Sequence, residues 1–277
     1  MKAPLSRLLV ACLLLMRAGN GLAEPPLVLA VVPQFPALEI HRTWTPVAKA
    51  VESAIGRTVE LKLYQSIPQF EQEFLAGAPD LVYLNPYHMV MAKKAVGYVP
   101  LVRDDAQKLS GLLVVQAGSP LTKVADLDGK TIAFPAPNAF GASLLPRALL
   151  ADQFKVRFTA NYVQTHSNAY RFVARGDVAA AGGIRTTFER EPEELRGKLR
   201  ILYETPAFAS HPVAAHPRLK PELRAKFVKA ILQMRQTREG SEQLAAVLMH
   251  DPVPADYARD YANLERLGLD RHVLSGN

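Results

Sequence analysis

The sequence predicts an α/β protein of two lobes, each built on a mainly parallel sheet flanked by helices. Short apolar runs alternate with helical patterns along the chain, which is typical of parallel βαβ units. The alternation occurs twice, in residues 27–102 and in residues 112–182, with the polar residues 103–110 between the two series. A hydrophobic content of 49% in 277 residues is enough for one large core or two ordinary ones.

The first series begins with the continuous apolar run 27–32, which suits a strand buried on both faces. A helical pattern follows from Trp44 to Ile55 and stops at Gly56. The same rhythm predicts strand 59–63, helix 69–75, strand 80–84, helix 89–96 and strand 98–102.

A second α/β core is expected after residues 103–110, which we interpret as the first crossing between the lobes. Its expected elements are strand 112–115, strand 131–134, helix 143–151, strand 162–164, helix 170–175 and strand 178–182. Residues 200–203 and 212–215 would carry the chain back, before C-terminal helices at 221–236, 241–249 and 254–267. The predicted boundaries are 24–108 and 210–277 for lobe 1 and 109–209 for lobe 2.

Residues 1–23 have the pattern of a secretory signal peptide. Lys2 and Arg7 precede the apolar run 8–16, and small residues end the segment at Ala23. The run is shorter than the roughly 20 residues that cross a bilayer, which argues against a membrane anchor. We expect cleavage after Ala23 and export to the periplasm. Cys12 leaves the alternative of a lipoprotein acylated at that residue.

Charge and cysteine content exclude several classes of partner and site. Three of the 33 basic residues and none of the 26 acidic ones lie in residues 1–23, so the mature net charge is +4. This excess is scattered, and a nucleic-acid partner is not expected. Cleavage would remove Cys12, the only cysteine, and with it any disulfide or thiolate site. No metal and no cofactor is expected, because His211 and His216 lack the spacing of metal ligands.

Candidate ligand-binding residues gather in loops that follow the expected strands, where open α/β sheets bind ligands. The turn 134–143 enters a helix whose free N–H groups favour an anion. Arg185 could add a positive charge, although Arg185 could also be a solvated surface residue, His166 a surface or core histidine, and Trp44 a core residue. The candidates are Trp44, Tyr83, Asn85, Tyr87, Asn138, Phe140, Gly141, Ala142, Ser143, His166, Ser167, Arg185 and Thr186.

Catalytic motifs are absent from the sequence. It contains no Gly-x-Ser-x-Gly, no His-Glu-x-x-His and no phosphate-cradling Walker or Rossmann fingerprint. A hydrolase or transferase that uses His166 or His211 as a base is the alternative, but it needs a nucleophile beside that base. We therefore expect a binding protein and not an enzyme.

Several segments resemble, in the same order, the phosphate, phosphite and phosphonate substrate-binding family of ABC transporters, often called PhnD-like. They are residues 80–87 (Asp-Leu-Val-Tyr-Leu-Asn-Pro-Tyr), 97–101 (Gly-Tyr-Val-Pro-Leu), 125–134, 141–148, 165–167 and 176–182. The resemblance covers about residues 27–232. The Asp-Leu-Asp-Gly-Lys segment at 126–130 is shared with the wider class of type II periplasmic binding proteins.

The resemblance implies a type II periplasmic binding protein with two hinge strands. Such a protein is expected to be a monomer that captures a small anionic ligand for an ABC permease or, alternatively, for a membrane sensor kinase. In the family, Ser and Thr hydroxyls before the Gly141 position help to hold phosphonate oxygens. Asn138, Ala139 and Phe140 occupy those places here, which predicts a weaker anion site.

Overall fold

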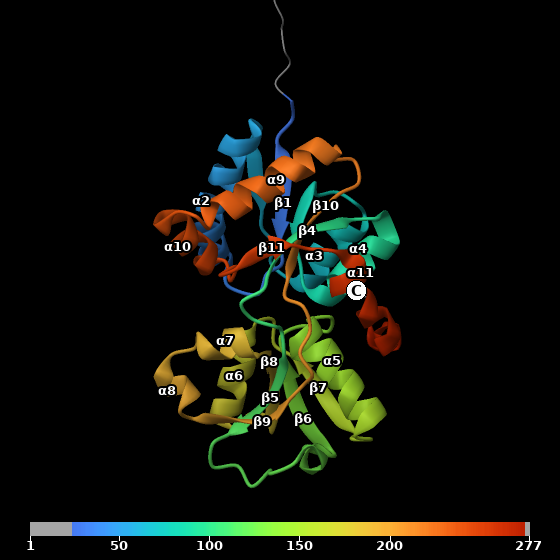
Figure 1. Ribbon diagram of the computed structural model, residues 1–277. Coiled ribbons are helices and arrows are strands. Elements are labelled where there is room, and N and C mark those ends of the chain that lie inside the picture. The colour runs from blue at the N-terminus through green and yellow to red at the C-terminus, as the bar shows by residue number, and fades with distance from the viewer. Residues whose placement is uncertain (1–23, 275–277) are drawn as a thin grey trace, which may run out of the picture.

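The computed structural model describes residues 24–274, which form two α/β lobes joined by two crossings of the chain (Figure 1). The six-stranded sheet of lobe 1 has the order β11-β4-β10-β3-β1-β2, and the five-stranded sheet of lobe 2 has the order β7-β6-β8-β5-β9. The predicted two-lobe architecture is confirmed. Residues 1–23, and with them the predicted signal peptide and Cys12, lie outside the described residues.

The two crossings lie side by side. The chain leaves lobe 1 between β4 (Val99–Asp104) and β5 (Gly111–Gln116), and returns between β9 (Leu199–Glu204) and β10 (Pro212–Ala215). Leu109 and Phe208 pair across the crossings through two backbone hydrogen bonds of 2.9 Å. We keep residues 108 and 209 as proposed boundaries, because both fall within these segments.

Lobe 1 begins with β1 (Leu27–Val31), which pairs in parallel with β2 (Val59–Lys62) and β3 (Leu81–Tyr83). Its first three helices are α2 (Ala37–Ile55), α3 (Ile67–Leu75) and α4 (Pro86–Val96). Helix α2 begins seven residues before the predicted start at Trp44, directly after Pro36. The side chains of Ser66 and Asn85 cap α3 and α4 by accepting backbone N–H bonds.

Both sheets are mixed, whereas the alternation in the sequence indicated mainly parallel ones. Strand β10 runs antiparallel to β3 and β4, and β5 runs antiparallel to β8 and β9. The reason is the pair of crossings. A strand that enters a lobe from the cleft runs opposite to the βαβ strands, whose carboxyl ends point toward the cleft.

Lobe 2 contains β6 (Lys130–Phe134), β7 (Phe158–Tyr162), β8 (Ala180–Ile184) and α6 (His166–Arg175). Short helical elements complete it: η1 (Val124–Leu127), α7 (Arg185–Glu189) and α8 (Glu193–Arg196). The strand predicted at 162–164 is therefore β7, which ends at Tyr162.

The helix predicted at 143–151 is longer and wider than expected. It consists of the π-helical turn η2 (Phe140–Leu144), α5 (Leu145–Ala148) and the π-helical turn η3 (Leu149–Gln153). In the first π turn, the N–H of Leu145 donates to the carbonyl of Phe140. Residues 135–143, which are the segment before this helix together with its first four residues, are called the ligand loop below.

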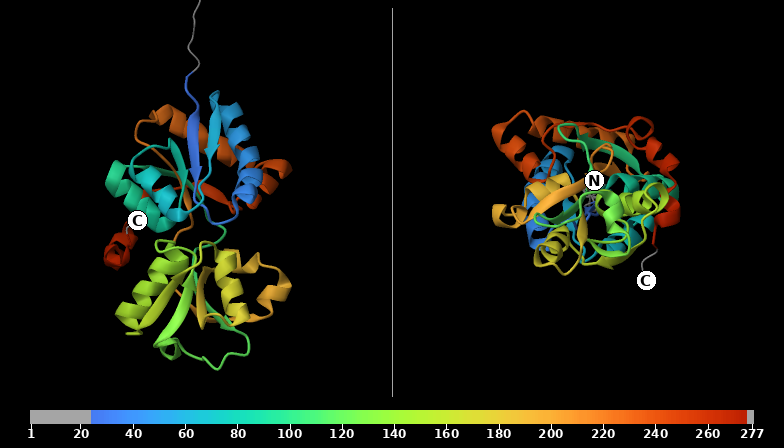
Figure 2. Two further views of the ribbon diagram at one scale, coloured as in Figure 1. Left: turned by 180° about the vertical axis from the view of Figure 1, so that it is seen from behind. Right: turned by 90° about the horizontal axis from the view of Figure 1, so that it is seen from below.

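The C-terminal region starts with the predicted helices, α9 (Pro221–Met234) and α10 (Arg238–Ala246). The single helix predicted at 254–267 is wrong. Edge strand β11 (Pro252–Pro254), α11 (Tyr257–Asp260) and the 3₁₀ turns η4 (Ala262–Leu267) and η5 (Leu269–His272) stand there instead. Two prolines favour the edge of a sheet over a helix. The chain then runs down beside α5 of lobe 2, as Figures 1 and 2 show.

Apolar packing continues from lobe 1 into the ligand loop. Ala139, Phe140 and Ala142 belong to the same buried cluster as the core of lobe 1, while lobe 2 has two smaller clusters of its own. The loop also lies directly on the lobe 2 sheet, because a Cβ on Gly182 would stand 1.9 Å from the carbonyl oxygen of Ala142. Glycine is needed there for close backbone approach.

No helix within residues 24–274 combines the length and the apolar character needed to cross a membrane.

Candidate functional site

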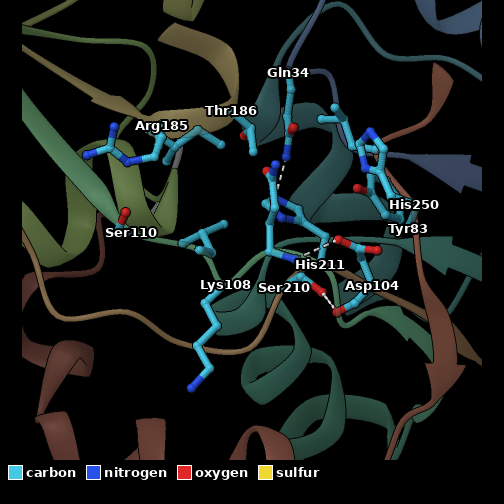
Figure 3. A pocket seen from close by; sticks show the side chains of 14 residues that line it. Gln34, Tyr83, Asp104, Lys108, Ser110, Arg185, Thr186, Ser210, His211 and His250 are labelled. Atoms are coloured by element: carbon cyan, nitrogen blue, oxygen red, sulfur yellow. Dashed lines mark hydrogen bonds between the residues drawn. The ribbon is translucent and has the colours of Figure 1, made fainter. Parts of the chain in front are cut away.

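The cleft between the lobes contains two neighbouring cavities of about 30 and 20 Å³. Their walls share Gln34, Leu109, Ile184 and His211, which come from both lobes and from the crossings. The larger cavity is drawn in Figure 3. Each volume holds no more than about two water molecules, so the lobes are closed on one another.

The ligand loop forms one wall of the smaller cavity. Phe140, Gly141 and Ala142 lie there opposite Asn85 and His166. The first backbone N–H groups of a helix have no intrahelical acceptor, so this turn offers donors to a ligand. A Cβ on Gly141 would stand 2.8 Å from side-chain atoms of Ile184 and Leu109, which leaves no room for a larger residue.

His166 begins α6 and faces the smaller cavity. Its Nδ1 lies 3.1 Å from the hydroxyl of Thr187, which lies 2.9 Å from the hydroxyl of Tyr170. Burial lowers the pKa of His166 to about 4. The imidazole is therefore neutral at neutral pH, with Nε2 left without a hydrogen-bond partner among the described residues.

Gln34 and His211 form a buried pair at the boundary of the two cavities. Gln34 follows β1 and His211 precedes β10, and the side-chain amide nitrogen of Gln34 contacts Nε2 of His211 (Figure 3). An amide nitrogen only donates, so Nε2 accepts and the ring is neutral. Burial, with smaller contributions from His88 and His166, lowers the pKa of His211 to about 3, in agreement with this geometry.

Asp104 is the acidic residue in the wall of the larger cavity, and its carboxylate already accepts hydrogen bonds from a crossing and from lobe 1. Its carboxylate accepts the backbone N–H of Asp251 at 2.6 Å and that of Gln107 at 3.2 Å. Its carbonyl accepts the hydroxyl of Ser210 at 2.6 Å. Asp104 therefore stabilises the end of β4.

Arg185 lines the larger cavity with Thr186, but its guanidinium points away from Gln34 and His211 (Figure 3). Nε donates to Glu204 at 3.1 Å, and a further nitrogen lies 3.4 Å from Glu189. Two exposed carboxylates thus neutralise the charge that the sequence suggested for the cleft.

The remaining predicted residues divide into two groups. Trp44 and Tyr83 pack against each other at 4.7 Å between ring centroids and line a third small cavity, and Tyr83 also lines the larger one. The others do not line these cavities: Tyr87 stacks on Phe140, Asn138 bonds to Glu71 and Leu274, Ser143 accepts from Arg147, and Ser167 donates to Glu191.

Cavity residues outside the predicted set include Gln34, Lys108, Leu109, Ser110, Ile184, His211 and His250. Gln34 lies in the loop after the first buried strand, so the same rule that selected the other loop residues, that ligands bind beyond strand ends, also applies to it. Leu109 and His211 lie in the crossings, where no local pattern marks a side chain that faces the cleft.

The matching family model spans residues 29–261 and describes the periplasmic phosphonate substrate-binding protein of ABC transporters. Among solved structures, PhnD1 from Prochlorococcus marinus in complex with methylphosphonate is similar, with a TM-score of 0.81, 16% identity and coverage of 90% of this chain and 98% of that one. A binding-protein component of an ABC phosphonate transporter from Pseudomonas aeruginosa gives a TM-score of 0.77 at 17% identity, covering 90% and 87%.

A Xanthomonas citri protein bound to chloride gives a TM-score of 0.76 at 16% identity, covering 89% of this chain and 98% of that one. At these identities, the three structures establish the fold alone. The family model covers most of the chain, including residues of both lobes. This chain therefore belongs to the periplasmic phosphonate substrate-binding protein family of ABC transporters.

Proposed function

We propose that the protein captures a small oxyanion of the phosphonate or phosphate class in its cleft and presents it to an ABC permease. The observation that carries this proposal is the smaller cavity. It brings the first N–H groups of the helix at Phe140 together with Asn85, His166 and the Gln34–His211 pair.

The hydrogen-bond donors around this cavity are uncharged, so they would bind an oxyanion through hydrogen bonds and the helix dipole and not through an ion pair. The helix N-terminus and neutral side chains can donate to phosphonate oxygens, and a hydrogen bond to a charged group contributes about 1.5–3 kcal/mol. Asp104, the acid in the wall, is engaged by backbone N–H groups and does not compete for these donors. The similar protein from Prochlorococcus marinus holds methylphosphonate.

Ligand entry requires the lobes to separate, because the present cavities hold only water-sized groups. The paired crossings at Leu109 and Phe208 are the natural hinge for this motion. Closure would then bring the ligand loop of lobe 2 against Gln34 and Asn85 of lobe 1.

Isothermal titration of the purified protein with methylphosphonate, phosphate and sulfate tests this proposal. We expect at least one of these anions to bind, and His166→Ala to weaken that binding about tenfold, as loss of one charge-assisted bond would. His216→Ala is the matched control, since His216 lies outside the cleft cavities. If only neutral or cationic metabolites raised the melting temperature, the oxyanion proposal would be abandoned.

We propose further that the protein is monomeric, is exported by cleavage after Ala23 and has no catalytic activity. Mass spectrometry of the mature protein distinguishes this cleavage from acylation at Cys12. Turnover of a bound ligand, abolished by His166→Ala, would favour the alternative of a cleft enzyme. Ligand-dependent binding to a membrane histidine kinase, with none to a permease, would favour the sensing role.

A further inference from the structure

The last described residues connect the two lobes at a third place, apart from the two crossings. Residues 269–274 leave lobe 1 and lie against α5 of lobe 2 (Figures 1 and 2). They lie beyond residue 261, where the match to the family model ends. We call residues 269–274 the C-terminal strap.

Arg147 joins this strap to the ligand loop. Its guanidinium donates to the carbonyl of His272 at 2.8 Å, to the carbonyl of Pro137 at 2.9 Å and, through Nε, to the hydroxyl of Ser143 at 3.2 Å. Arg147 is 7% exposed and has no acidic partner among the described residues. A buried cation that lacks a counterion depends on such hydrogen bonds, so the carbonyl of His272 stabilises the loop that Arg147 holds.

Asn138 makes the second connection. Its side-chain amide donates to the carbonyl of Leu274 at 2.8 Å and accepts the N–H of Leu274 at 3.0 Å. The same amide donates to Glu71 of lobe 1 at 3.0 Å, and the other carboxylate oxygen of Glu71 contacts His88 at 2.8 Å. Asn138 is therefore the point where the ligand loop, the strap and lobe 1 meet.

Both connections end on residues 137–143, the part of the ligand loop that carries Phe140, Gly141 and Ala142 into the cavity. The outer side of the strap is held by Asp152, which pairs with His272 at 2.8 Å and with Arg271 at 3.2 Å. These outer contacts are exposed to solvent and contribute less than the buried ones. The partly buried bonds to Arg147 and Asn138 are thus the ones that fix the loop.

We propose that the C-terminal strap positions the ligand loop and stabilises the closed arrangement of the lobes, with Arg147 and Asn138 as its positioning residues. The effect on ligand affinity rests on the proposed function, whereas the effect on lobe closure does not. If the ligand binds the closed arrangement, weakening the strap lowers affinity by as much as it lowers the population of that arrangement.

One matched pair of variants in the full chain isolates a single bond of the strap. Leu274→Pro removes the N–H that Asn138 accepts, while Leu274→Ala keeps it. The Leu274 side chain is 44% exposed, so its loss alone should change little. A chain that ends at Arg271 removes all three bonds from the strap to Arg147 and Asn138 while keeping Leu269, which is 1% exposed.

Lobe closure is measured without ligand by fluorescence energy transfer between dyes on Lys49→Cys and Glu194→Cys, in a Cys12→Ser background that has no other cysteine. Both labelled positions are exposed, one on each lobe. Dissociation of methylphosphonate, or of whichever oxyanion the titration identifies, is followed by stopped flow in the same proteins.

We expect Leu274→Pro to lower the transfer efficiency and to weaken ligand binding about threefold to tenfold, mainly through faster dissociation. Ending the chain at Arg271 should weaken binding by about tenfold or more. Leu274→Ala should match the unchanged protein in both measurements.

Equal transfer efficiency in Leu274→Pro and Leu274→Ala would overturn the strap proposal, even if ligand binds normally. A changed efficiency in a protein that binds none of the oxyanions would instead support the strap and reject the proposed ligand class. If the shortened chain fails to fold, the two Leu274 variants still decide between these outcomes.

Discussion

The two edges of the cleft, one beside α5 and the other beside α7, are closed by different kinds of contact. At the α5 edge, the ring of Phe140 is 1% exposed and packs against Tyr87 and Phe208, and the strap covers the outside. At the α7 edge, Arg190 reaches across to Glu39 at 3.0 Å and lies 4.6 Å above the ring of Phe35. The Arg190 and Glu39 side chains are 38% and 30% exposed.

This difference indicates how the cleft opens. Burial of a large aromatic ring contributes several kcal/mol, whereas an exposed ion pair contributes about 0–1 kcal/mol. The α5 edge should therefore stay together longer than the α7 edge. We expect a ligand to enter on the α7 side while the ligand loop remains close to lobe 1.

The largest effect is expected from Phe140→Ala. Loss of this buried ring should lower the free energy of unfolding by about 3–5 kcal/mol, measured by urea denaturation. Phe35→Ala, on the opposite edge, removes a partly exposed ring and should cost about 1 kcal/mol. If both variants lost the same free energy of unfolding, the two edges of the cleft would not differ in the strength of their contacts.

The buried histidines should make stability depend on pH. An unfolded chain titrates histidine near the ordinary pKa of about 6.5, whereas burial lowers the pKa of His166 to about 4 and that of His211 to about 3. As the pH falls below 6.5, the unfolded chain takes up protons that the folded chain does not. Stability should fall by roughly 2 kcal/mol per histidine between about pH 7 and pH 5.

Urea denaturation at the two pH values checks this expectation. His166→Gln should remove about half of the loss that His166 and His211 produce together, because His211 still contributes its share. His41→Gln, which changes an exposed histidine, should leave the loss unchanged. If His166→Gln lost as much unfolding free energy between pH 7 and pH 5 as the unchanged protein does, His166 would have no part in the pH dependence.

Arg190→Ala tests the α7 edge. The exposed pair with Glu39 should contribute less than about 1 kcal/mol to the free energy of unfolding, yet its loss should lower the transfer efficiency between labelled lobes. Arg238→Ala removes a more exposed pair, with Glu242, that does not join the lobes. If both variants lowered the efficiency alike, the α7 contact would have no part in closure.

The smallest effect is expected from Arg185→Ala. Its guanidinium is paired with Glu204 and Glu189, so its removal should change oxyanion affinity by less than about twofold in a titration. A loss of tenfold or more would mean that Arg185 leaves these acids and contacts the ligand.

Local patterns in the sequence predicted the architecture and one wall of the cleft. Alternating apolar runs and helices indicated two α/β lobes, and the rule for strand ends placed Phe140, Gly141, Ala142 and His166, which the fold brings to one cavity. Both follow from chain-local physics, because strand direction and the next turn are set by neighbouring residues.

Features that depend on distant partners could not be predicted in this way. The direction of Arg185 is set by Glu204, which lies 19 positions away, and the role of Asn138 depends on Leu274, which lies 136 positions away. Likewise, His211 faces the cavity only because a crossing passes there. The prolines at 252 and 254 suit an edge strand, but proline is also tolerated at the first position of a helix, which is where the prediction placed Pro254.

The π turn Phe140–Leu144 makes the site sensitive to chain length. A π turn contains about one residue more than an α turn, so deleting one residue here would rotate the preceding loop by about 100° around the helix axis. Asn138 would then face away from Glu71, and the N–H groups of Phe140 to Ala142 away from His166. Related genes should therefore reject single-codon insertions and deletions within this turn.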